Sequence, residues 1–310
     1  MFGNDRGDGK VDAQEILIVG CGDIGGRTAQ GLINAGHSVY GARRNPQNLP
    51  DGVQPVTLDV SDKESWQALT LSPDFIVYSV AAGGFAEEAY QAAYSDGIAN
   101  MLDWLKARQH QPKHILFVSS TSVYGQGEGE EVDENTEPKP AGFAGRIMLQ
   151  AEERLRKSNL PATSVRFSGI YGPGRDMLIR QVRQGRMAPE IPVMYSNRIH
   201  SDDCAGVLNH LLMLAQSGQT LDNIYLATDQ ASEPIHEVMS WMADILQVIP
   251  TEMVESPTRR RASSKRCINK RLLATGYQFI YPTYKDGYID ALKKVKKEIA
   301  EEKERAKIYD

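Results

Sequence analysis

Short runs of hydrophobic residues recur along most of the chain and are separated by stretches of mixed polar character. The first run, ILIVG at residues 16–20, is unbroken and ends in glycine. Further β-branched or aromatic runs occupy residues 37–44, 55–60, 74–82, 114–120, 162–172 and 223–228. Runs of this length and composition predict β-strands that are buried on both faces.

Amphipathic stretches with helical spacing lie between these runs. The first carries Ile24, Ala29 and Leu32 and stops at Gly36. Others are expected at residues 63–71, 85–108, 145–158, 202–216 and 235–246. Strands that alternate with helices predict an α/β fold, a Rossmann-type doubly wound parallel sheet with a smaller C-terminal substrate-covering region.

The rhythm of the pattern suggests how the chain is divided. We expect a flexible leader, a Rossmann domain, a covering region and a charged, solvated tail. Their bounds are 1–14 for the leader, 15–174 with a return at 202–230 for the Rossmann domain, 175–201 and 231–296 for the cover, and 297–310 for the tail. Residues 4–15 mimic a calcium-binding EF-hand loop, but Arg6 occupies a ligand position there and no entering helix precedes it.

Composition narrows the classes of partner. The 310 residues are 41% hydrophobic with a formal net charge of −5, so neither nucleic acid nor an anionic membrane is expected as a partner. The three cysteines are far apart and include no CxxC pair, which argues against a disulfide framework and a metal site. No uncharged run approaches the ~18 residues that span a bilayer. We expect a cytoplasmic protein, a monomer or homodimer.

One glycine-rich loop carries a specific chemical signal. Gly20, Gly22 and Gly25 form a GxGxxG pattern, with Asp23 and Ile24 inside it, directly between the first predicted strand and its helix. In this context the glycines permit a tight turn and close approach to a diphosphate, which binds at the positive end of the helix. The loop therefore predicts a dinucleotide site; the alternative is a glycine turn without a ligand.

The end of the second strand indicates which dinucleotide is bound. An NAD site usually has an acidic residue about twenty residues after the loop, but Arg43 and Arg44 stand there. Two guanidiniums favour a 2′-phosphate, and hence NADP(H) over NAD(H); alternatively they are solvated loop charges. Asp59 either accepts a hydrogen bond from the adenine or caps the next helix. Val60, Ala81 and Ala82 are the remaining predicted cofactor contacts.

Three further motifs follow in order. They are FVSSTSVYG at 117–125, RFSGIYGPGR at 166–175 and IHSDD at 199–203. Together with the loop they resemble the extended short-chain dehydrogenase/reductase superfamily, which includes nucleotide-sugar epimerases and dehydratases, over residues 15–290. The resemblance implies that Ser120 hydrogen-bonds the reacting oxygen of a substrate.

The resemblance fails at the superfamily's catalytic pair. The superfamily's Tyr-x-x-x-Lys pair aligns with Gly142 and Arg146, and the glycine loop is GxGxxG instead of the usual GxxGxxG. Both departures resemble an atypical subgroup. Arg146 could hold the nicotinamide ribose but cannot act as a general acid. Four candidates for the proton donor remain, namely Tyr124, Tyr171, Tyr195 and His200. Tyr124 is the preferred one.

Basic residues gather in the predicted cover. They are Arg175, Arg180, Arg183, Arg186, and the stretches 259–261 and 265–266. Paired guanidiniums suit phosphates or carboxylates, so an anionic, nucleotide-sugar-like substrate is expected, unless these are solvated surface charges. The leading hypothesis is an NADP(H)-dependent oxidoreductase or epimerase/dehydratase-like enzyme with atypical catalysis. The alternative is a catalytically silent NADP(H) sensor or scaffold.

Overall fold

A parallel sheet of seven strands forms the centre of the molecule. The structure is a computed structural model that describes residues 12–254 and 264–309. The strand order is β12-β7-β5-β4-β1-β2-β3, and the strands are β1 (Glu15–Val19), β2 (Ser38–Arg43), β3 (Gln54–Thr57), β4 (Phe75–Tyr78), β5 (His114–Ser120), β7 (Ala162–Phe167) and β12 (Ile224–Ala227). The order reverses between β1 and β4, where ligands of open α/β sheets bind. The predicted Rossmann fold is confirmed.

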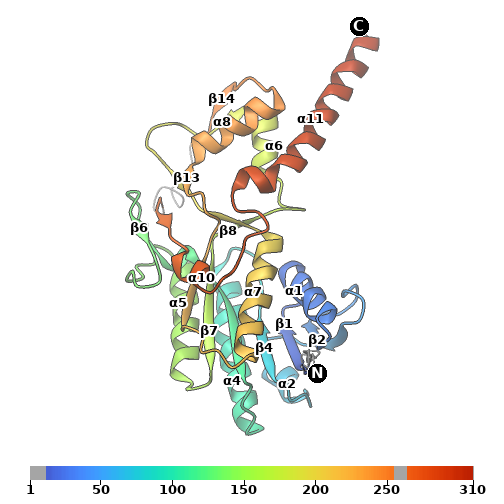
Figure 1. Cartoon of the computed structure of the whole chain (residues 1–310), viewed down its shortest axis with the longest axis vertical. Coiled ribbons are helices and arrows are strands. Elements are labelled where there is room, and N and C mark those ends of the chain that lie inside the picture. The colour runs from blue at the N-terminus through green and yellow to red at the C-terminus, as the bar shows by residue number, and fades with distance from the viewer. Residues whose placement is uncertain (1–11, 255–263, 310) are drawn as a thin grey trace, which may run out of the picture.

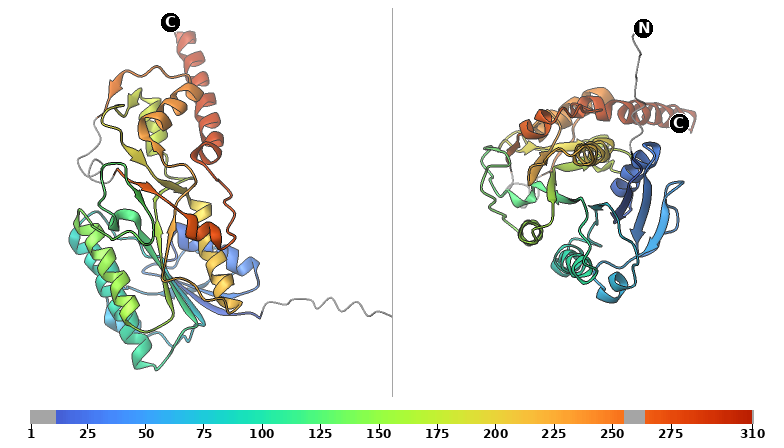
Figure 2. Two further views of the ribbon diagram at one scale, coloured as in Figure 1. Left: turned by 60° about the vertical axis from the view of Figure 1, so that its left-hand side comes forward. Right: turned by 60° about the horizontal axis from the view of Figure 1, so that its bottom comes forward.

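Helices cover both faces of the sheet (Figures 1 and 2). One face packs against α1 (Asp23–Asn34) and α7 (Ser201–Gln216). The other packs against α2 (Lys63–Gln67), α3 (Glu87–Tyr90), the π-helical segment η1 (Gln91–Asp96), α4 (Gly97–Ala107) and α5 (Phe143–Lys157). Alternation along β1 sends Leu17 to the second face and Ile16 and Ile18 to the first, so this strand is apolar after Glu15.

A third buried cluster lies beyond the carboxyl ends of the strands. It is built from α6 (Met177–Arg183), β9 (Arg186–Met187), α8 (Ile235–Leu246) and the start of α11 (Tyr284–Tyr309). The chain reaches it through β8 (Gly169–Tyr171), which pairs with β11 (Arg198–His200). The remaining short elements are η2 (Thr121–Val123), β6 (Glu131–Val132), β10 (Tyr195–Ser196), β13 (Glu233–Pro234), β14 (Glu252–Met253), β15 (Arg266–Cys267) and α10 (Lys270–Ala274).

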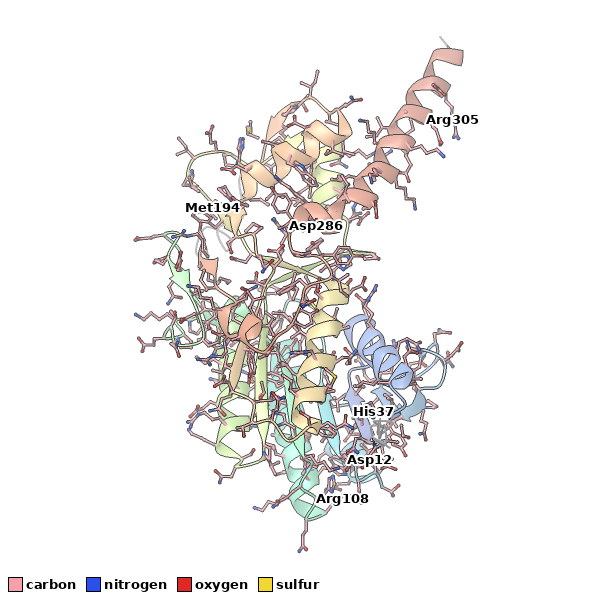
Figure 3. The ribbon with its side chains drawn as sticks, in the orientation of Figure 1. Asp12, His37, Arg108, Met194, Asp286 and Arg305 are labelled. Carbon is pink, nitrogen blue, oxygen red and sulfur yellow. The ribbon has the colours of Figure 1, made fainter. Side chains whose placement is uncertain are left out.

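Three predicted elements differ from the structure. The strand expected at 162–172 breaks at Ser168, where the chain leaves the central sheet. The helix expected at 85–108 contains the π-helical segment η1. The charged C-terminal helix begins at Tyr284, ahead of the predicted tail at 297–310, and its residues Tyr288 and Leu292 are buried in the third cluster. Only its last turns, around Arg305, project beyond the body (Figure 3).

Two structural findings bear on the possible classes of site. Within residues 12–254 and 264–309, no helix has the length and apolar character needed to cross a membrane. Nor do three or more His, Cys, Asp or Glu side chains of those residues gather where they could hold a metal ion. The EF-hand-like stretch before Asp12 and the arginines at 259–261 lie outside the described residues.

Candidate functional site

The glycine loop between β1 and α1 needs glycine at two positions for steric reasons. Gly20 has φ +87°, and a Cβ there would lie 2.6 Å from the backbone of Val80 at the end of β4. A Cβ on Gly25 would lie 2.5 Å from the carbonyl oxygen of Gly20. A Cβ on Gly22 would meet no described atom within 4 Å. The loop is therefore tightly packed at Gly20 and Gly25 and unobstructed at Gly22.

The first turn of α1 presents backbone donors and a neutralised acid. Gly22, the N-cap, supplies no side-chain hydrogen bond, and the first N–H groups of a helix have no partner within it. Asp23 accepts hydrogen bonds from Arg27, at 2.8 Å, and from Arg175. Burial alone would raise the pKa of Asp23, but these two guanidiniums hold it below its ordinary value. Because the two arginines offset its negative charge, Asp23 does not repel an anion from this helix end.

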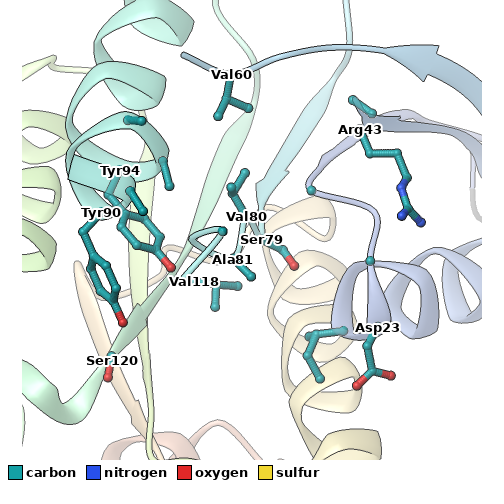
Figure 4. A pocket seen from close by; sticks show the side chains of 18 of the residues that line it. Asp23, Arg43, Val60, Ser79, Val80, Ala81, Tyr90, Tyr94, Val118 and Ser120 are labelled. Carbon is teal, nitrogen blue, oxygen red and sulfur yellow. The ribbon is translucent and has the colours of Figure 1, made fainter. Parts of the chain in front are cut away.

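A cavity of about 780 Å³ opens in front of the loop, at the carboxyl ends of the central strands (Figure 4). Most of the predicted cofactor and catalytic residues line it, namely Gly20, Gly22, Asp23, Ile24, Arg43, Arg44, Asp59, Val60, Ala81 and Ser120. Gly25, Ala82, Tyr124 and Arg146 are not among the residues that line it. Arg146 is exposed on α5, so its predicted contact with a ribose is not supported by its position.

Arg43 and Arg44 lie at one end of the cavity, where β2 ends. Figure 4 shows the Arg43 side chain on the opposite side of the cavity from Tyr90 and Ser120. The carboxylate of Asp59 accepts hydrogen bonds from the backbone N–H and the hydroxyl of Ser61, at 3.0 and 2.8 Å. Asp62, not Asp59, caps α2, which removes the alternative role considered for Asp59.

Ser120 and Ser168 lie at the other end. Ser120 ends β5, and its Oγ accepts a hydrogen bond from the Ser122 N–H at 3.1 Å, so its own hydroxyl proton can be donated into the cavity. Ser168 is 5% exposed, lines the cavity, and has a buried Oγ that finds no hydrogen-bond partner among the described residues. A ligand polar group would satisfy this atom.

A second cavity of about 620 Å³ adjoins the first. The two share Ile170 and Arg175 as lining residues. Its cationic side chains are Arg175, Arg180, Arg198 and Lys265. Arg183 and Arg186 do not line it; Arg183 pairs with two acids of α11, and Arg186 with Glu252. The structure thus separates basic residues that the sequence shows only as a cluster.

The comparisons with known proteins agree with this architecture. The profile of the NAD dependent epimerase/dehydratase family matches residues 16–222. The chain belongs to that family.

Two relatives of this epimerase/dehydratase family member align with almost its whole length. Protein YeeZ of Escherichia coli K12 is 27% identical, with 87% of this chain and 97% of that protein aligned. A Methylobacillus flagellatus structure, described provisionally as an NAD-dependent epimerase/dehydratase, is 35% identical with TM-score 0.74 and covers 91% and 98% of the two chains.

Two solved complexes share the fold at lower identity. One is the UDP-glucose 4-epimerase of Thermus thermophilus with NAD, at 20% identity and TM-score 0.72, covering 88% of this chain and 96% of that one. The other is the human epimerase family protein SDR39U1 with NADPH, at 21% identity and TM-score 0.69, covering 91% and 99%.

Tyr124, the preferred proton donor, is buried in a structural network of this epimerase/dehydratase fold. Its hydroxyl donates to the Asp133 carbonyl at 2.7 Å and accepts from Arg166 at 2.6 Å. Burial, which outweighs the effect of Arg166, raises the pKa of Tyr124 to about 12. A hydroxyl on a side chain that is 1% exposed, outside the cavity lining and engaged on both sides is not available to a substrate.

The other candidate donors are also occupied or distant. His200 caps α7, where its Nδ1 accepts from the Asp202 N–H, and burial lowers the pKa of its imidazole despite Asp202 and Asp203. Tyr171 stacks on Tyr288 with ring centroids 4.3 Å apart. Tyr195 lines the second cavity, not the first.

Sequence reasoning missed two tyrosines of the first cavity. Tyr90 and Tyr94, from the end of α3 and from η1, both line it. Figure 4 shows the Tyr90 hydroxyl directed toward Ser120 and the Tyr94 hydroxyl directed toward Ala81 and Val118. Their spacing of four residues in a predicted helix was a usable signal, but nothing in the sequence showed which face of that helix met the cavity.

The site residues fit a nicotinamide dinucleotide. The open face at Gly22 and the uncapped first turn of α1 suit a diphosphate. The unpaired Oγ of Ser168 lies at the end where Ser120 lines the cavity, and suits a polar group such as a carboxamide. The first-turn N–H groups would hold the diphosphate in the middle of the cofactor, and Ser168 and the two arginines where β2 ends would hold its two ends.

Proposed function

We propose that this protein is an NADP(H)-dependent oxidoreductase or epimerase that acts on a carbonyl or alcohol carried by an anionic, nucleotide-sugar-like substrate. The observation that carries the proposal is the pair of adjoining cavities. One has a glycine cradle with two arginines at one end and Ser120 at the other, and the second is lined by four cationic side chains. The region around the third cluster serves as the substrate cover.

The preference for NADP(H) rests on Arg43 and Arg44. Both line the first cavity where β2 ends, and the residues of that strand end include no acid that would favour a ribose 2′-hydroxyl. Solved relatives with NAD and with NADPH both exist, so the fold itself allows either. Two guanidiniums favour the form that carries a 2′-phosphate.

The anionic substrate follows from the second cavity. Arg198 is 4% exposed, and its Nη1 has no hydrogen-bond partner within the described residues. Lys265 is also 4% exposed, and its Nζ donates to the Tyr124 carbonyl at 2.9 Å. An unpaired buried donor is costly unless a ligand satisfies it, and a phosphate or carboxylate would do so. The Thermus relative is named for UDP-glucose, a substrate of this charge.

Ser120 supplies the first part of the chemistry. A bound nicotinamide dinucleotide supplies the hydride donor or acceptor. The Ser120 hydroxyl, fixed by the Ser122 N–H, donates to the substrate oxygen and stabilises the negative charge that develops there.

A silent sensor or scaffold is the second candidate. It is favoured by Gly142, where the family resemblance places the catalytic tyrosine, and by the buried position of Tyr124. The two candidates differ in one observable. An oxidoreductase changes the absorbance of its nicotinamide with a substrate, whereas an epimerase converts its substrate while the bound nicotinamide is oxidised and reduced in turn, and Ser120→Ala lowers either rate by roughly 10²–10³-fold. A sensor binds the cofactor and leaves its redox state unchanged on every substrate offered.

Thermal-shift titration tests the cofactor directly. NADPH should raise Tm more than NADH at equal concentration, because tighter binding to the native state stabilises more. Arg43→Ala/Arg44→Ala should weaken NADPH binding by about tenfold or more, the loss of charge-assisted hydrogen bonds, and leave NADH binding nearly unchanged. Arg156→Ala, an exposed arginine of α5 that pairs with Glu153, is the matched control. Equal or better stabilisation by NADH would contradict the NADP(H) assignment.

A further inference from the structure

We infer that Tyr90 carries the proton for the reaction proposed above, and that it does so from α3, beside the family's usual tyrosine position at the start of α5. The inference rests on the oxidoreductase function and names the group that this function still lacks. It also explains how the site can work with glycine at position 142.

Tyr90 stands where a proton donor is needed. It is the last residue of α3 and lines the first cavity together with Ser120, Phe167 and Ser168. In Figure 4 its hydroxyl points into the cavity toward Ser120, at the end opposite Arg43. A substrate oxygen bound by Ser120 therefore lies on the side that the Tyr90 hydroxyl faces.

An aromatic cluster fixes the Tyr90 ring. Its ring centroid lies 5.5 Å from that of Phe143, 5.8 Å from that of Phe85 and 5.4 Å from that of Tyr94. The contacts with Phe143 and Phe85 are edge-to-face, the arrangement that aromatic pairs favour. Half-burial leaves the hydroxyl end accessible, so the side chain is held by its ring and free at its oxygen.

The position that the family's tyrosine would occupy is open. Gly142 is the N-cap of α5, and a Cβ placed on it meets no described atom within 4 Å. Phe143, the next residue, packs against Tyr90. Tyr90 thus reaches the neighbourhood of the missing side chain from the α3 side, and Phe143 links the two positions.

The other titratable groups of the cavity are already engaged. Tyr94 is 8% exposed, its hydroxyl accepts from the Ala82 N–H, and burial with the neighbouring Tyr90 raises its pKa to about 12. Asp23 is paired with arginines, and Asp59 with Ser61. Among the described lining residues, Tyr90 is left as the group with both a transferable proton and access to the cavity.

The proton step balances with the proposed cofactor. In the reducing direction the substrate carbonyl carbon gains a hydride from the reduced nicotinamide, which is oxidised, and the C=O electron pair moves onto oxygen. That oxygen forms its O–H bond with the Tyr90 proton as the phenol O–H bond breaks, and the tyrosinate then takes a proton from water. In the oxidising direction the tyrosinate removes the proton from the alcohol.

The test uses the full chain labelled with carbon-13 at tyrosine Cζ, with NADP+ and NADPH as probes. The two cofactor forms differ by a positive charge on the nicotinamide ring. The Tyr90 resonance is assigned as the one that Tyr90→Phe lacks. We expect it to shift when NADPH is exchanged for NADP+, and to shift more than the Tyr94 resonance. Tyr225, buried on β12 away from the cavity, should not respond.

A second variant adds a tyrosine, so that the test does not depend only on the resonance lost in Tyr90→Phe. Gly142→Tyr introduces a tyrosine at the family position, where open space receives it, and its resonance should respond to the cofactor's charge as that of Tyr90 does. If the introduced tyrosine responds and Tyr90 does not, the inference is overturned while cofactor binding stands. If neither NADP+ nor NADPH raises Tm, the proposed function itself fails.

Discussion

Two buried arginines in this protein have opposite surroundings. Arg166, on β7, is 1% exposed, and each of its guanidinium nitrogens donates a hydrogen bond within the protein. Nε and Nη2 donate to Glu152 at 2.9 and 2.6 Å, and Nη1 donates to the Tyr124 hydroxyl. Arg198, on β11, is 4% exposed. Its Nη2 donates to Ser196, whereas its Nη1 has no partner among the described residues.

The acids near the two arginines differ in the same way. Glu152 accepts from Arg166 at both oxygens. Asp229, which influences Arg198 electrostatically, keeps a buried Oδ2 without a partner in the described part of the chain. Folding stability favours the first arrangement, because an unpaired buried charge is expensive. The second is tolerated in the wall of a cavity, where a ligand can supply the missing partner.

The largest expected loss of stability comes from removing the counter-ion of Arg166, the fully paired arginine. Glu152→Gln leaves the Arg166 charge buried without its counter-ion, and we expect the free energy of unfolding to fall by about 3–5 kcal/mol. Denaturant unfolding measures it. Lys63→Ala, which breaks the exposed pair with Asp103, should change it by less than ~1 kcal/mol.

A double variant sharpens this result. Replacing both Arg166 and Glu152 with apolar residues of similar volume should recover much of the loss, since no unpaired charge then remains. If the double variant is no more stable than Glu152→Gln, the cost lies in the lost hydrogen bonds of the network and not in the orphaned charge.

The second effect is a pH dependence at Asp229. Burial, reinforced by Asp203 and Asp286 and opposed by the Ala231 N–H and Arg198, raises the pKa of Asp229 from 3.8 to about 7. A carboxyl whose pKa is higher in the folded state binds more protons there. Its contribution to stability is therefore complete below pH 3.8 and is lost as pH rises to about 7.

Asp229→Asn removes this contribution, so stability should vary less between these pH values than in the parent protein. Thermal unfolding at a series of pH values measures the difference. Asp51→Asn, at an exposed turn position, should leave the parent profile in place. A parent profile that rises across this range, with no change in Asp229→Asn, would show that Asp229 is already ionised.

The smallest effect on stability is expected at Arg198. Arg198→Met keeps the apolar stem and removes an unpaired donor, so the unfolding free energy should fall by less than ~1.5 kcal/mol, about the net value of one hydrogen bond. Binding should respond more. With UDP as the probe, calorimetry should show Kd raised by about tenfold or more, the loss of a charge-assisted contact.

Arg183→Met is the matched control for binding, because Arg183 pairs with Glu298 and Glu302 of α11 and does not line the second cavity. It should leave UDP binding unchanged. A stability loss at Arg198 as large as that of Glu152→Gln would remove the distinction between the two buried arginines.

Features governed by local chain geometry could be predicted from the sequence. The glycine loop, the strands around it and the position of Ser120 at a strand end follow from residue spacing and backbone sterics, and the structure has them in the expected elements.

Features that depend on long-range packing could not be predicted. Arg183 and Arg198 are indistinguishable by type, yet one meets acids of α11 and the other a cavity. Tyr124 follows a strand end, as a ligand contact would, but Arg166 and Asp133 enclose its hydroxyl. Only tertiary contacts decide these cases.

The π-helical segment η1 has a consequence for the direction in which Tyr90 faces. A π-helical turn corresponds to one extra residue in an α-helix, and each residue turns a helix by about 100°. Deleting one codon within Gln91–Asp96 would therefore rotate Tyr90 off the cavity wall relative to α4.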